Sequence, residues 1–219
     1  MTALRLALTA PASAPAFDIV VMAASLGGRE VLESVLARLP ADFATPIVLV
    51  QHAGQHAPRL LPLLLARRTS LEVRYAVHGE ALARGVVHVA PPGTHAVVSR
   101  ARALRLSDGP RVSYARPSAD RLFGSAALAF GARTLGVVLT GKLFDGAAGA
   151  SAIRRAGGVV LAQDPGSCLA PDMPQAAIDR GAVHLTLPPE GLGFAIAALV
   201  SSPCLSAVLG LGAPPRAVA

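Results

Sequence analysis

The sequence predicts an α/β fold: a doubly wound, mostly parallel sheet with helices on both faces and an appended antiparallel hairpin. Short aliphatic runs alternate with helical patterns along the 219 residues, as in parallel strands joined by crossover helices. The runs are apolar almost throughout, which suits strands that are covered on both faces. Hydrophobic residues make up 53% of the chain, enough for one sizeable core.

Seven apolar runs of five to seven residues predict the strands of the sheet. Each run is flanked by turn residues or by a helical pattern, and at this length it is too short to be a buried helix. The expected strands are 18–23, 46–51, 71–77, 86–90, 134–140, 158–163 and 182–187.

Helical periodicity predicts six helices between or after these strands. Pro62 lies inside the second of them, where it should kink the helix or mark its true first turn. Residues 95–107 contain two short runs with no helix between them, which predicts the hairpin. The expected helices are 29–39, 57–68, 119–131, 146–157, 174–181 and 191–200.

We expect one folded domain at 18–202, a flexible tail at 1–17 and a C-terminal tail at 203–219. The first segment is rich in Ala and Pro and has only Arg5 as a basic residue, so it is a poor signal peptide. No apolar run approaches the roughly 20 residues that span a bilayer. These features predict a cytoplasmic protein without membrane insertion.

The net charge of +7 at pH 7 predicts attraction to acidic partners. The arginines are scattered and are not interleaved with aromatic residues, so we expect no nucleic-acid binding. Cys168 and Cys204 are far apart and lack the spacing of metal ligands. The glycine-rich fingerprints of dinucleotide-binding and P-loop proteins are missing. These absences argue against a phosphate-binding loop and against a cysteine metal site.

Three polar side chains follow three of the expected strands. Ser25 follows the first strand, His52 the second, and Asp145 the run that ends at residue 140. Chemistry in such folds gathers beyond the carboxyl ends of parallel strands. At one edge these residues would form a triad in which serine attacks, histidine takes its proton and aspartate orients the imidazole.

Each of these residues also has an ordinary interpretation. Ser25 and Asp145 both precede a helix, which is the position of an N-cap. His52 alone would be a polar turn residue, and His56 with it would make a two-histidine metal site. No third ligand of suitable spacing is present, which argues against that metal site.

The turns around the triad contain the expected supporting residues. Gly27 opens the first helix, and amides near Leu26 and near Lys142 are the natural donors to an oxyanion. Thr140 and Gly141 are expected to shape the second turn. Lys142 is the only lysine of the chain; it either places a cation beside an oxyanion or substrate carboxylate, or points to solvent or pairs with Asp145.

These motifs together resemble the catalytic domain of the CheB family, the protein-glutamate methylesterases of bacterial chemotaxis. The resemblance runs from about Asp18 to about Leu192 and implies that Ser25, His52 and Asp145 are the triad. It implies hydrolysis of γ-glutamyl methyl esters and often deamidation of glutamines, without a cofactor. The segments that carry it are VVMAASLGG, VLVQH, VHVAPPGTH, RPSADRLFGSAA, GVVLTGKLFDGAAG, IRRAGGVVLAQD and DMPQAAIDRGAV.

The chain departs from the family's pattern beside the triad. Ala23 and Leu26 stand where the family has Gly and a small residue around the nucleophile. Lys142 and Leu143 stand where it commonly has Met-Gly, so Leu143 needs a backbone angle that a leucine can accept. Because few residues precede the resemblance, we expect a stand-alone homologue without a receiver domain.

The resemblance implies the cytoplasmic helices of chemoreceptors, or another acidic protein, as partner. Arg116 is expected to meet acidic side chains of that substrate, and Met173 to line the cleft. Two alternatives stay open at this point. One is a serine esterase with a different substrate, and the other is a non-catalytic module that binds a signalling partner on the same fold.

Overall fold

The computed structural model describes residues 16–202, 205 and 210–211. Its centre is a seven-stranded sheet in the order β3-β4-β2-β1-β7-β8-β9, and all of its neighbouring strands are parallel. The predicted fold class is confirmed. The strands are β1 (Ile19–Ala24), β2 (Ile47–Gln51), β3 (Glu72–Tyr75), β4 (Val86–Val89), β7 (Thr134–Val138), β8 (Val159–Gln163) and β9 (Leu185–Leu187).

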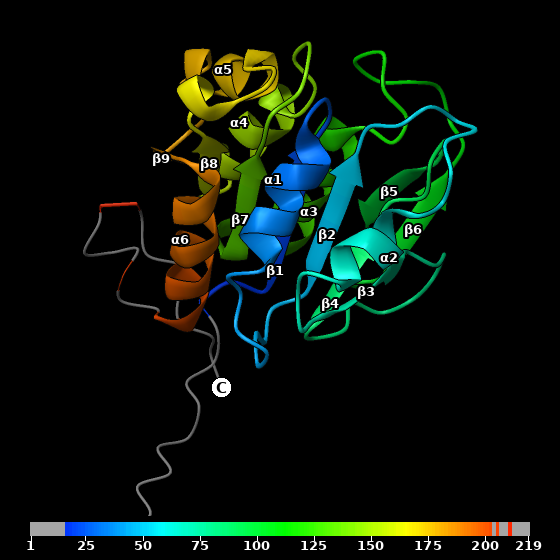
Figure 1. Cartoon of the computed structure of the whole chain (residues 1–219), viewed down its shortest axis with the longest axis horizontal. Coiled ribbons are helices and arrows are strands. Elements are labelled where there is room, and N and C mark those ends of the chain that lie inside the picture. The colour runs from blue at the N-terminus through cyan, green and yellow to red at the C-terminus, as the bar shows by residue number, and fades with distance from the viewer. Residues whose placement is uncertain (1–15, 203–204, 206–209, 212–219) are drawn as a thin grey trace, which may run out of the picture.

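Helices cover both faces of this sheet (Figure 1). The second helix begins only at Leu61, and Pro62 marks its first turn instead of kinking it, because proline fits where the amide has no helical acceptor. The α-helices are α1 (Gly28–Leu36), α2 (Leu61–Ala66), α3 (Ala119–Phe130), α4 (Ala147–Arg155), α5 (Asp172–Asp179) and α6 (Pro189–Ser201), with 3₁₀ turns at Gly131–Arg133 and Pro165–Ser167.

The core has two layers, one on each face of the sheet. Successive side chains of a strand point to opposite faces, and β1 shows this clearly. Val20 and Met22 pack with apolar residues of α1, α2 and α6, whereas Val21 and Ala23 pack with those of α3, α4 and α5. Both sets are fully buried, which explains why the sequence of β1 is apolar throughout.

The predicted hairpin is present as β5 (His95–Val98) and β6 (Leu104–Ser107), which pair antiparallel. It forms a separate two-stranded sheet and does not extend the main one. Ala96 and Leu104 join the same apolar layer as α3, and Ser125 Oγ of α3 accepts a hydrogen bond of 2.9 Å from the Val98 amide. The hairpin is therefore appended through a helix.

The predicted tails lie mostly outside the described residues. Ala16 and Phe17, which were included in the first tail, are buried in the core, and the Ala16 amide donates to the carbonyl of Val200 at 3.0 Å. Within residues 16–202, 205 and 210–211, no helix is long and apolar enough to cross a membrane.

The strand order places a topological switch point at β1. From β1 the chain builds β2, β3 and β4 on one side, then returns to lay down β7, β8 and β9 on the other. Ligand sites of open α/β sheets lie beyond the carboxyl ends of the strands at such a point. Ser25 directly follows β1, and the chain leaving its two neighbours carries His52 and Asp145.

Candidate active site

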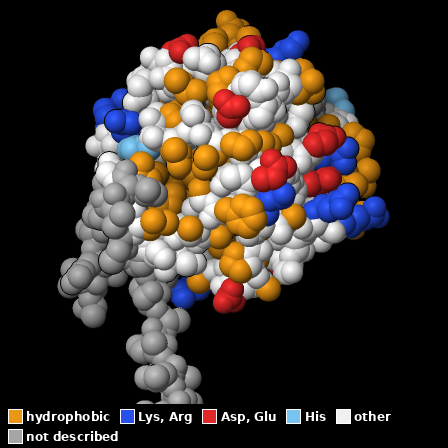
Figure 2. Space-filling model, turned by 60° about the vertical axis from the view of Figure 1, so that its left-hand side comes forward, with side chains coloured by type: hydrophobic (Ala, Val, Ile, Leu, Met, Phe, Trp, Pro, Cys, Tyr) orange, Lys and Arg blue, Asp and Glu red, His pale blue; other side chains and the backbone are white. Residues whose placement is uncertain are grey.

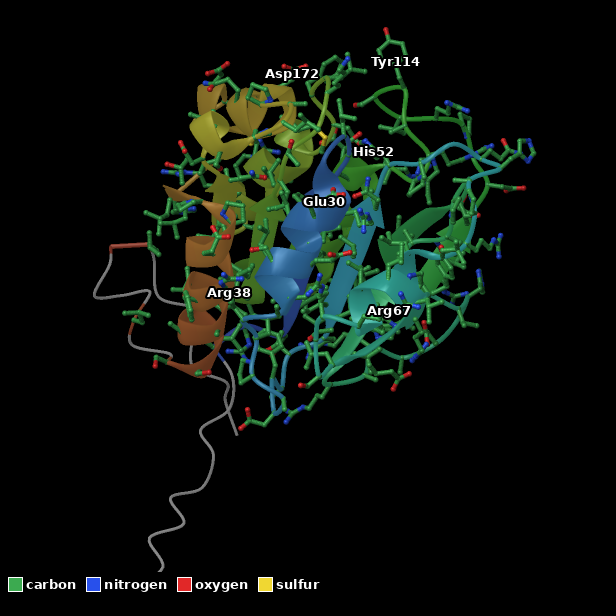
Figure 3. The ribbon with its side chains drawn as sticks, in the orientation of Figure 1. Glu30, Arg38, His52, Arg67, Tyr114 and Asp172 are labelled. Atoms are coloured by element: carbon green, nitrogen blue, oxygen red, sulfur yellow. The ribbon has the colours of Figure 1, made fainter. Side chains whose placement is uncertain are left out.

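Ser25, His52 and Asp145 all line one cleft of about 380 Å³ at the carboxyl edge of the sheet. His52 lies at this end of the molecule together with Tyr114 and Asp172, whereas Arg38 and Arg67 lie far from it (Figure 3). β1 is hydrogen-bonded to both β2 and β7, so residues distant in sequence follow adjacent strands. The topology therefore brings the three predicted side chains together.

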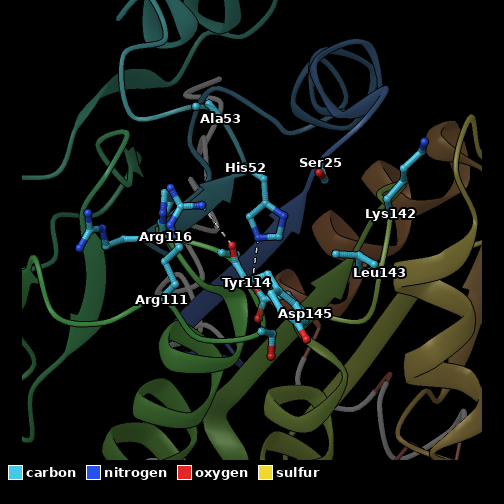
Figure 4. Close-up of a pocket in the computed structure, with 13 residues that line it drawn as sticks. Ser25, His52, Ala53, Arg111, Tyr114, Arg116, Lys142, Leu143 and Asp145 are labelled. Carbon is cyan, nitrogen blue, oxygen red and sulfur yellow. Dashed lines mark hydrogen bonds and ion pairs between the residues drawn. The ribbon is translucent and has the colours of Figure 1, made fainter.

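A hydrogen bond of 2.8 Å joins His52 Nε2 to Asp145 Oδ2. An ionised carboxylate only accepts hydrogen bonds, so Nε2 carries the proton and Nδ1 is left as an acceptor. Figure 4 shows this second ring nitrogen on the side of Ser25. Among the described residues no hydrogen bond of the Ser25 hydroxyl is present.

Asp145 is 1% exposed, and its carboxylate is held from several directions. Oδ1 accepts from Ser118 Oγ at 2.9 Å and from the Asp120 amide at 3.0 Å, and Oδ2 accepts from the Ala119 amide at 2.7 Å. Burial alone would raise the pKa of this carboxyl, but the hydrogen bonds from His52 and the two amides outweigh it and lower the pKa. Asp145 is therefore ionised and fixed in place.

The N-cap interpretations fail in two different ways. Gly27, in the left-handed region at φ 77°, occupies the N-cap position of α1, and no side chain caps that helix. Asp145 does bind helix amides, but they belong to α3 and not to the α4 helix that follows it. Neither Ser25 nor Asp145 is thus explained by its own helix.

Thr140 and Gly141 connect the turn after β7 to the turn after β1. Thr140 Oγ1 donates to the carbonyl of Leu26 at 3.0 Å and is itself buried. A Cβ on Gly141 would lie 2.6 Å from Ser25 Cβ and 2.2 Å from Met173 Sδ, distances that the chain could not accommodate. Only glycine therefore allows the two turns to approach this closely.

Two glutamines that the sequence interpretation missed hold these turns. Gln51 Nε2 donates to the carbonyls of Ser25 and His52 at 2.8 and 3.1 Å. Gln163 Oε1 accepts from the Thr140 amide at 2.9 Å. Each glutamine ends a β-strand, and a polar residue ending an otherwise apolar run was the available signal.

Three backbone amides beside the serine are without an acceptor in the described chain: those of Leu26, Gly27 and Lys142. The neighbouring amide of Gly141 is already used, because it donates to the carbonyl of Ala170 at 2.8 Å. Free amides at a strand-to-helix turn are the groups that stabilise a negative oxygen. The turn thus has donors available for an anionic ligand.

The wall and rim of the cleft are basic. Arg116 donates to the carbonyls of Asp108 and Gly109, the second at 3.1 Å, and so ties its own loop. Lys142 also lines the cleft, and no ion pair involves it within the described residues. Its side chain extends away from His52 and Asp145 (Figure 4), so pairing with Asp145 is excluded in this structure.

The remaining predicted residues have other positions. Met173 is fully buried beneath Gly141 and does not line the cleft. Leu143 adopts φ 66°, the left-handed conformation that disfavours a side chain. Arg111 and Tyr114, which sequence reasoning missed, also line the cleft; nothing in their local sequence indicates that their loop folds over the strand ends.

No group of three or more His, Cys, Asp or Glu side chains suited to a metal ion is found in the part of the chain that the structure describes. His56 is exposed. Burial raises the pKa of the Cys168 thiol to about 11, so little thiolate is present near neutral pH.

One face of the molecule shows its Lys and Arg side chains in several separate places (Figure 2). On the face in Figure 2, Lys and Arg side chains lie next to Asp and Glu and do not gather into one broad basic area. This agrees with the scattered arginines of the sequence. A nucleic-acid interface would require a continuous basic stripe, and this face has none.

Comparisons with known proteins agree with the geometry. The family described as CheB methylesterase matches residues 20–196. A protein-glutamate methylesterase/protein-glutamine glutaminase of Anaeromyxobacter dehalogenans is 44% identical over 85% of this chain and 54% of its own length. Protein-glutamate methylesterase FrzG of Myxococcus xanthus is 40% identical over 83% of this chain and 54% of its own. The chain thus spans about half the length of these relatives.

The crystal structure of the Thermotoga maritima CheB methylesterase catalytic domain has the same fold. It superposes with a TM-score of 0.80 at 30% sequence identity, covering 84% of this chain and 99% of that one. The similarity therefore extends over nearly all of a catalytic domain of known structure.

Proposed function

The chain belongs to the CheB methylesterase family, and we propose that it hydrolyses methyl esters of protein glutamyl side chains with a Ser25–His52–Asp145 triad. The observation that carries this proposal is the 2.8 Å bond between His52 and the buried Asp145 in a cleft that also contains Ser25. A histidine held in one tautomer, with its other nitrogen free beside a serine, is the arrangement that activates a hydroxyl.

In the first step Ser25 Oγ attacks the ester carbonyl carbon, and its proton passes to His52 Nδ1. The tetrahedral intermediate then breaks its bond to the methoxy oxygen, which takes the proton from His52 and leaves as methanol. Asp145 stabilises the imidazolium that exists between these events, since its carboxylate already accepts from Nε2. The product of this step is a glutamyl ester of Ser25.

In the second step water attacks this acyl-enzyme and gives a proton to His52. Breaking the bond to Ser25 Oγ returns that proton to the serine and releases the glutamate carboxylate. The same steps with a glutamine side chain would release ammonia. Several relatives are named as both methylesterase and glutaminase, which supports including deamidation in the proposal.

The free amides of Leu26, Gly27 and Lys142 are the proposed donors to the oxyanion of both intermediates. One such donor typically lowers the barrier by about 3 kcal/mol. These amides are rigidly held because Thr140 connects the two turns that carry them. The side chain of Lys142 points elsewhere, so its proposed role is to attract a substrate carboxylate at the rim.

The proposed substrate is an acidic protein segment, with the cytoplasmic helices of chemoreceptors as the family's expected target. The basic side chains of Arg111, Arg116 and Lys142 line the cleft, and charges of this sign favour encounter with an acidic surface. A serine esterase with a different substrate remains the second candidate, because Lys142, Leu143 and Phe144 replace the usual turn.

A fluorophosphonate probe tests the nucleophile independently of the substrate. We expect wild type to be labelled and Ser25→Ala not to be labelled. Ser34→Ala is the matched control, since this hydroxyl lies on α1 outside the cleft and contacts Glu190. Failure of folded wild type to react would instead favour a non-catalytic binding module.

Methanol release then tests the substrate. Methylated chemoreceptor or a peptide containing a glutamyl methyl ester should yield one methanol for each ester removed, and none with Ser25→Ala. Labelling by the probe without methanol release would assign the chain to the second candidate, an esterase of different specificity.

A further inference from the structure

Two aspartates exchange helix caps beneath the cleft. Asp145 lies just before α4, yet its carboxylate accepts from the first amides of α3, those of Ala119 and Asp120. Asp120 lies in the first turn of α3, yet its Oδ1 accepts from the Gly146 amide at 3.0 Å and the Gly149 amide at 2.8 Å, at the start of α4. Each helix start is thus bound by the carboxylate of the other element.

This exchange fixes the position of Asp145 more closely than a single cap would. The amide of Asp120 donates to Asp145, while the side chain of Asp120 holds the residue that directly follows Asp145. The carboxylate of Asp145 and the backbone that directly follows it are therefore both held by the same turn of α3. A shift of Asp120 would move the start of α4 and, with it, the acceptor of His52.

A third contact extends the exchange to the wall of the cleft. Ser113 Oγ donates to Asp120 Oδ2 at 3.0 Å. Ser113 belongs to a two-residue turn with Tyr114, and both have positive φ angles of 50° and 63°. Such angles are costly for residues other than glycine and persist only where surrounding contacts fix them. Asp120 supplies one of those contacts.

Stability alone would not favour a carboxylate at residue 120, so close to that of Asp145. Burial raises the pKa of Asp120, and the nearby charge of Asp145 raises it further, so ionising both carboxylates is unfavourable. A neutral polar residue would satisfy the same amides without this repulsion. What needs an explanation is therefore the position of the Asp120 side chain between the two helices, and not its charge.

We propose that Asp120 is a positioning residue that sets the Asp145 carboxylate for its hydrogen bond to His52 by capping α4 in exchange for the cap on α3. It touches no substrate, because it does not line the cleft. The inference rests on the proposed triad for its effect on rate, whereas its effect on the His52–Asp145 bond can be measured without any reaction.

Two substitutions separate position from charge. Asp120→Asn keeps the size and the Oδ1 acceptor of both amides but removes the charge, and we expect it to react with the fluorophosphonate within about three-fold of wild type. Asp120→Glu keeps the charge but moves the carboxylate by one methylene, and we expect labelling to slow by about 10- to 100-fold, because misplacing a reacting group by about 1 Å can cost about 100-fold in rate.

The proton NMR signal of His52 Nε2–H gives a readout that needs no activity. It should appear downfield in wild type, vanish in His52→Gln for assignment, persist in Asp120→Asn and weaken in Asp120→Glu. Asp18→Asn is the control for a general loss of stability, since Asp18 pairs with Arg133 at 2.7 Å on the opposite edge of the sheet. It should leave both readouts unchanged.

The outcomes are distinct. Equal labelling and an intact signal in Asp120→Glu would overturn the proposal, as would a more than ten-fold loss of labelling in Asp120→Asn. If Asp120→Glu does not fold, the labelling rate of Asp120→Asn still tests the proposal, because a more than ten-fold loss would overturn it. If wild type is not labelled but its signal depends on residue 120 as expected, the proposed function fails while the positioning role stands.

Discussion

Two histidines of the described chain are bonded to carboxylates, and only one of these pairs lies at the cleft. His52 follows β2 and shares a 2.8 Å bond with Asp145, while His88 lies within β4 and shares a 3.1 Å bond with Glu80. The first histidine has a free nitrogen at a cleft. The second is 0% exposed, and its Nε2 accepts from the Ala83 amide at 3.4 Å.

The two pairs differ in the other groups that their carboxylates and their imidazole rings contact. Glu80 also pairs with Arg74, so the second pair is part of an ion-pair network that closes the segment after β3. Among the described residues no Lys or Arg pairs with Asp145, and backbone amides and Ser118 satisfy the acceptor sites that His52 leaves. A histidine–carboxylate pair that is to act as a general base therefore needs more than a short distance between its two groups. It needs an imidazole nitrogen without a partner and a carboxylate whose cationic or polar side-chain partners do not compete with the imidazole.

The largest expected effect comes from removing each imidazole in turn. His52→Gln should lower ester hydrolysis by about 10³-fold or more, because no other side chain can take the serine proton. His88→Gln should change it by less than about three-fold at 25 °C, since His88 does not line the cleft. Initial rates of fluorophosphonate labelling and methanol release provide the measurement. Equal losses of activity in His52→Gln and His88→Gln would contradict the difference proposed between the two histidines.

Stability should show the reverse order. His88→Ala would leave the Ala83 amide unpaired and a cavity in the sheet, lowering the free energy of unfolding by about 3 kcal/mol. His52→Ala should cost about 1 kcal/mol or less, because the ring is partly exposed and Asp145 keeps three other donors. Urea unfolding followed by circular dichroism measures both.

The two pairs should also respond to different pH ranges. Burial lowers the pKa of His88 below its ordinary 6.5, so the unfolded chain binds this proton more readily than the folded chain. Stability from His88 is therefore lost as pH falls below about 6.5, with a limiting slope of about 1.4 kcal/mol per pH unit. The pKa of Asp145 lies below its ordinary 3.8. The stability that its ionised carboxylate contributes is therefore kept until the pH falls below about 3.8.

Urea midpoints between pH 7 and pH 5 test this separation. Wild type should lose more stability across the interval than His88→Gln, whose side chain does not titrate. Burial also lowers the pKa of His95 and His184, so the variant should retain part of the loss. Asp145→Asn should destabilise equally at both pH values, and a cost that shrinks at pH 5 would argue against a low pKa for Asp145.

The sequence could indicate the fold and the three strand ends because both depend on local patterns. Aliphatic runs define the strands, and parallel strands bring their carboxyl ends to one edge. It could not indicate which helix Asp145 caps, since the local pattern at residues 145–149 is that of an ordinary N-cap. The observed partner, α3, is fixed by packing between elements that are distant in sequence.

The same limit explains the residues that sequence reasoning misplaced or missed. Met173 follows a loop and was expected in the cleft, but it packs beneath Gly141 because that glycine leaves space for its sulfur. Arg111 and Tyr114 lie in a loop whose path is set by contacts such as the 2.9 Å bond from His95 to Pro110. Proton transfer from Ser25 stays a prediction, since geometry alone does not test it.

Lys142, which makes no ion pair with any described residue, offers a smaller effect. Lys142→Met restores the residue common in the family, and we expect KM for an acidic ester peptide to rise about five-fold with kcat nearly unchanged, since an exposed pair contributes at most about 1 kcal/mol. An uncharged ester peptide should show no change in KM. A fall in kcat with both substrates would instead assign Lys142 to the oxyanion.

The smallest effect concerns backbone strain in the turn that carries Asp145, whereas neither His88 nor Glu80 has a positive φ angle. Leu143 has φ 66°, a conformation that costs a leucine roughly 1–2 kcal/mol, whereas the larger unfolded-state entropy of glycine offsets about half of any gain. Leu143→Gly should therefore raise the free energy of unfolding by about 0.5 kcal/mol. Phe144→Gly is the control, because Phe144 is absent from the residues with positive φ, and it should be destabilising. If Leu143→Gly were destabilising too, the contacts of the leucine side chain would contribute more to stability than its φ angle costs.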